Sequence, residues 1–365
     1  MISRCLLVIL LLRPACKAVI QKNLVVLSAP SVWDIHYQSH FHELIQFQIN
    51  FARTVRAYER SVVLADRHTM PFLTGRSHRI SSKLPSENLM EASIYDPQLR
   101  QIAPLMVRGK TIKYDCRYRR LDRVAARQID MSMRRFIDRN RLPIDKFDKE
   151  LMLCGRDIVD NQRDMAIINK DAVEDNKGRL PNWAVLIKLF STFRKVVLLP
   201  NPKQLMSDAR MHLDDLASFV ERNLVVMSAL PNQESSFSRK KIARKLGANL
   251  HIIETPVHHT QGTCGLYSTL LATDNFVYVP VFGYGAENWS KGYSTLTDRK
   301  VVRMIRANTK KTVVPVRIPF RICKLGYSIK SLAWVTKDKL ADRLSQVVRW
   351  RNHKRRHYRR RFGLT

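Results

Sequence analysis

Several features that mark common enzyme classes are scarce or absent in this sequence. The chain has only 12 glycines among 365 residues, and it contains no G-x-G-x-x-G or G-x-x-x-x-G-K-[ST] pattern. Loops that bring backbone N–H groups close to phosphates need glycine at fixed positions. The sequence therefore gives little support for a dinucleotide- or nucleoside triphosphate-binding enzyme.

Paired cysteines are also absent. Cys5 and Cys16 lie near the N-terminus. The other four cysteines are far apart: Cys116, Cys154, Cys264 and Cys323. Zinc sites usually show a short C-x-x-C spacing, so we expect no metal site, and nothing in the sequence calls for a cofactor. Export would permit disulfides, but the spacing predicts no pairing, and we expect buried free thiols.

Acidic residues are few. The 31 Asp and Glu residues face 64 Lys and Arg residues, which gives a net charge of +33. A charge of this size attracts polyanions such as nucleic acid, lipopolysaccharide or acidic protein; the alternative is a solvated basic surface. The densest basic stretch is Arg349–Arg361, and we expect residues 346–365 to form a flexible basic tail that contacts such partners.

A long hydrophobic run is missing as well. The longest one, Cys5–Leu12, follows Arg4 and precedes small residues near Ala15 and Ala18. This pattern is typical of a secretory signal and is too short for a stable membrane span. We therefore expect a leader at residues 1–18 and a secreted or periplasmic protein without a stable membrane span. The alternative is a mitochondrial address.

Short β-branched runs alternate with helical patterns along the rest of the chain. The predicted strands are Leu24–Ser28, Ser61–Ala65, Thr111–Cys116, Lys195–Leu199, Asn223–Ser228, Phe276–Val281 and Thr312–Val316. The predicted helices are Ser39–Tyr58, Asp122–Asp138, Asn182–Phe193, Ser236–Leu246 and Asp298–Asn308. The strand–helix–strand unit returns about five times, which predicts an α/β fold with similar modules around one centre.

The segment Met211–Met227 contains the most informative motif, H-x-D at His212 and Asp214. Two residues that are two apart in an extended chain project from the same strand face. A carboxylate beside a histidine can fix its tautomer and keep it protonated near neutral pH. By itself this motif also fits two unrelated surface residues.

The surroundings of this motif resemble the agmatine deiminase and Porphyromonas-type peptidyl-arginine deiminase family. The strand Asn223–Ser228 follows the motif, and RKVVLLPNP precedes it. Downstream, Tyr267–Gly283 is similar to the family's tyrosine-led strand pair, and the likeness covers most of residues 23–340. It implies a pentein fold over residues 19–345, an α/β propeller of five ββαβ-like modules around a pseudo-fivefold axis.

The resemblance also implies a reaction and a site. In this family a cysteine thiolate attacks a guanidinium carbon, ammonia leaves, and hydrolysis gives a urea. Carboxylates hold the guanidinium and a histidine moves protons. His212 and Asp214 match the histidine and one of the carboxylates.

The position of the nucleophile departs from the family pattern. In Cys323–Trp334, Gly326 and Ile329 stand where the family predicts, but Ser331 takes the place of the cysteine. A serine hydroxyl ionises far less readily than a thiol and needs an adjacent base. Cys323 is a possible substitute nucleophile, eight residues upstream.

The substrate-holding residues depart from the pattern too. Asp96–Pro104 matches a D-x-W-x-R-D-x-x-P motif with Gln98 in place of the tryptophan and Gln101 in place of the second aspartate. Further along, Cys154 and Arg156 replace a glutamate and a glycine of a family turn.

Two further residues are assigned to the substrate site by the same resemblance. Thr269 stands where an asparagine or similar residue is expected, and Arg119 or Arg120 matches a segment that binds the far end of the substrate. A solvated basic edge explains the two arginines equally well.

Two hypotheses follow for the function. In the first, the chain is a family member with lost or much reduced catalysis, and its cleft binds a guanidinium, an arginyl peptide or an anion. In the second, it is an active deiminase on agmatine or arginyl peptides that uses Ser331 or Cys323.

Overall fold

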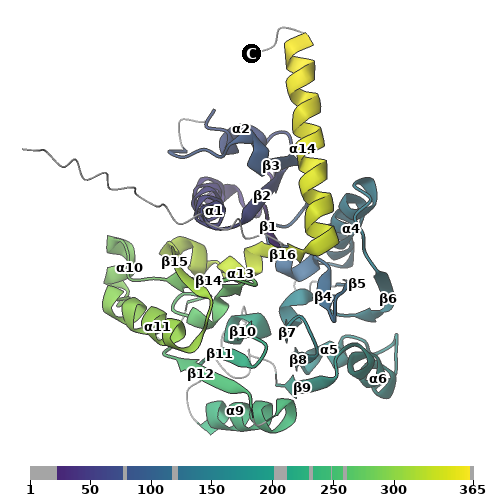
Figure 1. The fold of residues 1–365 in the computed structure, drawn as a ribbon, viewed down its shortest axis with the longest axis vertical. Coiled ribbons are helices and arrows are strands. Elements are labelled where there is room, and N and C mark those ends of the chain that lie inside the picture. The colour runs from purple at the N-terminus through teal and green to yellow at the C-terminus, as the bar shows by residue number, and fades with distance from the viewer. Residues whose placement is uncertain are drawn as a thin grey trace, which may run out of the picture.

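The structure is a computed structural model that describes residues 23–76, 80–116, 122–200, 212–229, 233–247, 249–257 and 261–361. It contains five small sheets that lie around a common centre (Figure 1). The first sheet has the strand order β16 (Ala333–Lys337), β1 (Asn23–Ser28), β2 (Arg60–Ala65) and β3 (Leu89–Glu91). The other four sheets have three strands each. The second contains β4 (Leu105–Val107), β5 (Lys110–Asp115) and β6 (Lys146–Met152), and the third contains β7 (Ile158–Asp160), β8 (Met165–Asn169) and β9 (Lys195–Leu199). The fourth contains β10 (Ala217–Glu221), β11 (Leu224–Ser228) and β12 (His251–Thr255), and the fifth contains β13 (Leu271–Ala272), β14 (Phe276–Val281) and β15 (Thr312–Arg317).

All five sheets repeat one connection. A first strand pairs antiparallel with a middle strand, and the middle strand pairs parallel with the next one. Parallel neighbours need a crossover, and one long helix supplies it in each case: α1 (Phe41–Arg56), α4 (Arg123–Arg139), α6 (Asn182–Thr192), α9 (Gln233–Leu246) and α11 (Thr295–Asn308). The two ends of the described chain complete the first sheet, where Val25 on β1 faces Val335 on β16.

The remaining short elements lie in the connections. They are η1 (Gln38–His40), α2 (Met70–Leu73), η2 (Ser86–Asn88), α5 (Asp171–Glu174), α10 (Ala286–Ser290) and α12 (Phe320–Lys324). The predicted strands and long helices are present, with ends shifted by a few residues at most. The predicted α/β fold with repeated strand–helix–strand units is therefore confirmed.

The middle strands form the buried centre of each module. Every residue of β1, β8 and β11 is buried, because these strands are covered on both faces. The helix α1 contributes its apolar face, and Leu44 and Ile45 are fully buried there. This packing holds the ends of the strands in fixed positions at the centre of the molecule.

The last helix corrects the prediction of a flexible tail at residues 346–365 as far as residue 361; residues 362–365 lie outside the described part of the chain. The helix α14 (Asp338–Arg361) is continuous through the basic stretch, and its C-terminal end projects from the rest of the molecule (Figure 1). Leu344 and Val348 lie one helical turn apart and are both buried, so the apolar pattern continues past the point where we ended it. Arg351 also anchors the helix, since its Nη1 donates to the Glu91 carbonyl at 2.7 Å.

No helix in the described part of the chain is both long and apolar enough to cross a bilayer.

Candidate active site

Five one-turn helices meet at the centre, and each precedes the first strand of one sheet. They are α3 (Leu99–Ile102), η3 (Gly155–Asp157), α8 (Leu213–Leu216), η4 (Tyr267–Thr269) and α13 (Ile329–Leu332). Each contacts two of the others, in the order α13, α3, η3, α8, η4 and again α13. Space for these contacts is tight, because a Cβ atom on Gly155 would lie 1.8 Å from the Arg100 carbonyl oxygen. Residues that are far apart in sequence thus share one small volume.

A buried guanidinium occupies this volume. Arg156 on η3 is 4% exposed, and its Nε donates to Asp214 Oδ1 at 3.1 Å. Its Nη2 donates to both carboxylate oxygens of Asp215 at 2.8 Å, and its Nη1 donates to Gln98 Oε1 at 2.5 Å. Two buried carboxylates and an amide oxygen therefore surround a single guanidinium, and each of its three nitrogens donates to a different one of them.

The Arg156 guanidinium and the two carboxylates that it contacts shift each other's pKa values. Burial lowers the pKa of Arg156, but the attraction of Asp215 and Asp214 outweighs it and leaves the pKa above its ordinary value. Burial raises the pKa of Asp215 to about 7, and Arg156 opposes this rise without cancelling it. The arginine therefore stays charged, and the two aspartates together balance its positive charge.

The predicted strand at His212 and Asp214 is replaced by a helical turn. The segment after His212 is the helical turn α8 and not a strand, so the two side chains do not project from one strand face. His212 is the N-cap residue: its side chain accepts from the Asp215 N–H, and its own N–H donates to Asp215 Oδ2 at 2.9 Å. Asp214 Oδ1 binds Arg156, whereas its Oδ2 is buried without a hydrogen-bond partner.

The structure places Ser331 at the centre, but in a closed local network. Its Oγ donates to the Ser328 carbonyl at 3.1 Å and accepts from the Ser328 N–H at 2.9 Å, and the side chain is fully buried. The Ser328 Oγ in turn accepts from the Ser331 N–H at 3.0 Å. Both serines thus cap α13, and the hydrogen bonds that the structure gives for the Ser331 hydroxyl all go to Ser328, which is not a base.

Lys330, which the sequence analysis did not single out, extends into the same centre. Its Nζ donates to the Ala217 carbonyl at 2.8 Å, to Ser218 Oγ at 2.8 Å and to the Asp214 carbonyl at 3.2 Å. Burial lowers its pKa to about 7, although the charge of Asp214 opposes this shift. Three acceptors match the three hydrogens of an ammonium group, so the site holds a second internal cation.

The other predicted substrate residues lie around this centre with varied contacts. Asp96 is buried and accepts from the Gln98 N–H at 2.7 Å. Gln101 is buried with an unpartnered Oε1, and Thr269 donates to the Leu266 carbonyl at 2.7 Å. Arg120 lies outside the described residues.

Both cysteine predictions need correction. Cys116 pairs with Cys154, and Cys264 pairs with Cys323, so these four residues are disulfide-bonded and not free thiols. The pairs are 38 and 59 residues apart in sequence, and only the fold brings them together. Because its sulfur is already bonded, Cys323 is unavailable as a substitute nucleophile in this state.

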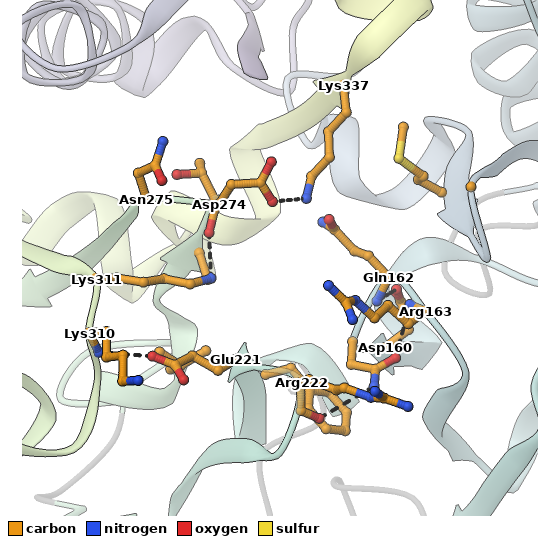
Figure 2. A pocket seen from close by; sticks show the side chains of 17 residues that line it. Asp160, Gln162, Arg163, Glu221, Arg222, Asp274, Asn275, Lys310, Lys311 and Lys337 are labelled. Carbon is orange, nitrogen blue, oxygen red and sulfur yellow. Dashed lines mark hydrogen bonds and ion pairs between the residues drawn. The ribbon is translucent and has the colours of Figure 1, made fainter. Parts of the chain in front are cut away.

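A cavity lies at the end of the strands opposite to the five one-turn helices. It has a volume of about 630 Å³ and is lined by the turns that join β4 to β5, β7 to β8, β10 to β11 and β13 to β14. Figure 2 shows its side chains, in which Lys337 pairs with Asp274 and Lys311 Nζ donates to the Thr273 carbonyl at 2.5 Å. None of the predicted site residues lines it. The described residues also contain no cluster of His, Cys, Asp and Glu that would hold a metal ion.

The sequence analysis missed the roles of Arg156, Asp215 and Lys330. The signal for Arg156 was its place in a family turn where a glycine is expected, since a long cation there must find a partner inside. Lys330 directly precedes the serine at the nucleophile position, and Asp215 directly follows Asp214. Charged residues in or directly beside the motif positions were thus the available signal for these roles.

Comparison with known proteins agrees with this architecture. No protein of curated function matches the sequence significantly. Among solved structures, agmatine deiminase of C. jejuni superposes with a TM-score of 0.66 at 15% identity, over 87% of this chain and 94% of that one. A cysteine-to-serine variant of that enzyme with substrate bound gives 0.67 at 14% identity, with the same shares covered.

The agmatine deiminase of Enterococcus faecalis gives a TM-score of 0.64 at 14% identity, over 87% of this chain and 94% of that one. Identities this low establish a shared pentein-type α/β fold and no more. The family model is more direct evidence, because Porphyromonas-type peptidyl-arginine deiminase matches residues 19–318. The chain therefore belongs to the Porphyromonas-type peptidyl-arginine deiminase family.

Proposed function

We propose that this chain is a family member without deiminase activity, in which Arg156 fills the place of the substrate guanidinium. The observation that carries the proposal is the contact of Arg156 Nε with Asp214, 3.1 Å apart. Asp214 is the aspartate that the family resemblance assigns to the substrate. An external guanidinium would have to displace an internal one that is held by two carboxylates.

The residues at the nucleophile position support the same conclusion. The Ser331 hydroxyl caps α13, and the Cys323 sulfur is in a disulfide. Loss of a nucleophile in hydrolases costs about 10³ to 10⁶ in rate. In addition, Arg156 places a positive charge where a cationic substrate would bind, which opposes its entry, and Lys330 adds to this charge below its pKa of about 7.

We also propose that the five modules form an α/β propeller around a pseudo-fivefold axis, with the five one-turn helices at its centre. The repeated strand connection and the order of contacts among these helices support this geometry. On this view the residues at the centre are the remnants of a deiminase site. They now stabilise the fold through internal ion pairs.

The rival function is an active deiminase on agmatine or arginyl peptides that uses Ser331. One of the solved relatives is a cysteine-to-serine variant with substrate bound, so in that protein a serine at an altered position is compatible with a ligand. In this chain Arg156 takes up that space, which disfavours the rival.

A colorimetric assay for ureido products separates the two functions. Agmatine and a blocked arginyl peptide are incubated with the wild type, with Ser331→Cys and with an active agmatine deiminase as positive control. We expect no turnover by the wild type. Turnover by the wild type that Ser331→Ala abolishes would establish the active deiminase instead.

Two disulfides in one chain also support a proposal on compartment. Structural disulfides persist in oxidising environments and are rare in reducing ones. We therefore propose export through a secretory route, and fractionation of cells that express the tagged chain tests it. A pool that stays in the cytosol with all thiols reduced would contradict the proposal.

A further inference from the structure

A groove between α4 and α14 combines arginines with an exposed aromatic ring. It has a volume of about 600 Å³. Its lining comes from the end of α4 and from one side of α14: Arg139, Asn140, Arg141, Arg343, Gln346, Val347, Trp350 and Arg351. The lining contains four arginines and no carboxylate. The described lining of this groove is therefore positively charged. In the cavity of Figure 2, by contrast, lysines lie beside Asp274 and Glu221.

Two arginines of this groove, Arg139 and Arg141, carry charge that no ion pair within the described residues neutralises. Arg139 and Arg141 are exposed, and neither forms an ion pair within the described residues. Arg343 Nε donates to the Asn140 carbonyl at 3.2 Å, and Arg351 Nη2 donates to Asn140 Oδ1 at 2.9 Å. Asn140 thus accepts hydrogen bonds from Arg343 and Arg351 and fixes both guanidinium groups at the edge of the groove.

Trp350 gives the groove a stacking surface. Its side chain is 57% exposed, and Lys354 Nζ lies 4.2 Å from the ring centroid. A base can stack on such a ring, and cations close to the ring strengthen binding of the adjoining phosphate.

The sequence of α14 stays basic beyond the groove. From Arg343 to Arg361 the sequence has nine Lys and Arg residues and no Asp or Glu. This part of the helix is roughly 27 Å long at 1.5 Å per residue, and it projects from the body of the molecule beyond α4 (Figure 1). The sequence therefore gives this projecting helix a strongly basic composition.

We propose that the groove between α4 and α14 binds single-stranded nucleic acid, with one base stacked on Trp350 and the flanking phosphates on the surrounding arginines. A duplex hides the faces of its bases, so an exposed indole favours a single strand. A groove of this volume suits one nucleotide, because small-molecule pockets span about 300 to 1,000 Å³.

The test is fluorescence anisotropy of the full chain with a labelled 12-nucleotide single strand, over a range of salt concentrations. The variant Trp350→Ala removes the stacking surface, and Trp183→Ala is the matched control because Trp183 is 66% exposed on α6. We expect Trp350→Ala to bind roughly 5- to 100-fold more weakly. Trp350→Phe should restore much of the affinity, and Trp183→Ala should bind like the wild type.

The phosphate contacts have their own test. The double variant Arg139→Gln/Arg141→Gln is compared with Arg299→Gln/Arg303→Gln on α11, which removes two exposed arginines from another helix. Loss of two phosphate contacts should reduce the slope of log affinity against log salt by roughly 1.4 for the groove variant. The control variant should keep the wild-type slope.

Three results would overturn the proposal. One is equal affinity for the single strand and for a duplex of the same sequence. Another is an equal loss of affinity in Trp350→Ala and Trp183→Ala. The third is tighter binding to heparin or to anionic phosphatidylserine vesicles than to the single strand, with no effect of Trp350→Ala; it would assign the surface to sulfated glycans or membranes.

Discussion

Arg156 Nη2 lies 2.8 Å from both carboxylate oxygens of Asp215, although the two residues are 59 positions apart in the sequence. Both side chains are almost completely buried. A buried ion pair costs desolvation energy that its attraction does not always offset. The fold therefore depends on both partners, because the removal of one of them leaves an uncompensated charge in the interior.

The first prediction concerns the removal of this guanidinium. Arg156→Ala leaves Asp214 and Asp215 without their cation, and we expect a loss of about 3–5 kcal/mol in the free energy of unfolding near neutral pH. Urea denaturation of both proteins measures it. Millimolar agmatine should then raise the melting temperature of Arg156→Ala, because it returns a guanidinium to the vacated space.

Two controls accompany that measurement. Putrescine carries ammonium groups and no guanidinium, so it should rescue Arg156→Ala less than agmatine does. The wild type should not respond to agmatine. A wild type that agmatine stabilises as much as the variant would show that Arg156 does not fill the ligand site.

The second prediction concerns pH. Asp215 has a pKa raised to about 7, so the folded state holds its proton more tightly than the unfolded state, and its contribution to stability falls as pH rises from about 4 to 7. Lys330 has a pKa lowered to about 7, so its contribution rises as pH increases from about 7 to 10.

These opposite slopes have separate readouts. The free energy of unfolding of Lys330→Met, subtracted from that of the wild type at pH 7, 8 and 9, should show a difference that changes by a few kcal/mol in favour of the wild type. The same subtraction for Asp215→Asn should change between pH 5 and 7 in the opposite direction. A pH-independent difference for Lys330→Met would mean that this amine keeps its ordinary proton affinity inside the protein.

The sequence predicted the long elements of this fold well. The strand Lys195–Leu199 and the helix Asn182–Phe193 were located almost to the residue, because β-branched runs and a 3.6-residue apolar period are strong signals. First strands such as β7 and β13 have only three and two residues, and the helical turns before them have three or four. Segments this short carry no periodicity, so they were not predicted.

The candidate site shows a different limit. The sequence and the family resemblance brought His212, Asp214 and Ser331 to one centre, and the structure places Asp214 and Ser331 there on α8 and α13. The sequence and the resemblance did not reveal that a guanidinium of the chain itself contacts Asp214. Asp214 Oδ1 binds Arg156, 58 positions away in the sequence, and this contact depends on how the fold brings η3 and α8 together.

The third prediction concerns the disulfides. Mass spectrometry after alkylation without reductant should find Cys116, Cys154, Cys264 and Cys323 unmodified, and peptide mapping should give the pairs 116–154 and 264–323. Loss of either bond through a double Cys→Ser change should lower the free energy of unfolding by about 2–4 kcal/mol, because each bond closes a long loop in the unfolded chain. Full alkylation of Cys323 in the native protein would contradict the pairing and would make that thiol a candidate nucleophile again.

The fourth prediction separates a structural from a catalytic Ser331. The side chains of Ser331 and Ser328 cap α13 for each other, since each hydroxyl accepts from the other's backbone N–H at 2.9 and 3.0 Å. Ser331→Ala and Ser328→Ala should therefore each lower the free energy of unfolding by about 1 kcal/mol, the usual cost of a lost helix cap. Ser328 has no place in the family chemistry, so it is the matched control. If Ser331 were the nucleophile, its replacement alone would abolish release of ureido product while Ser328→Ala retained it. Because the hydroxyl points into its own helical turn, we expect the two variants to be indistinguishable in both the unfolding and the activity measurements.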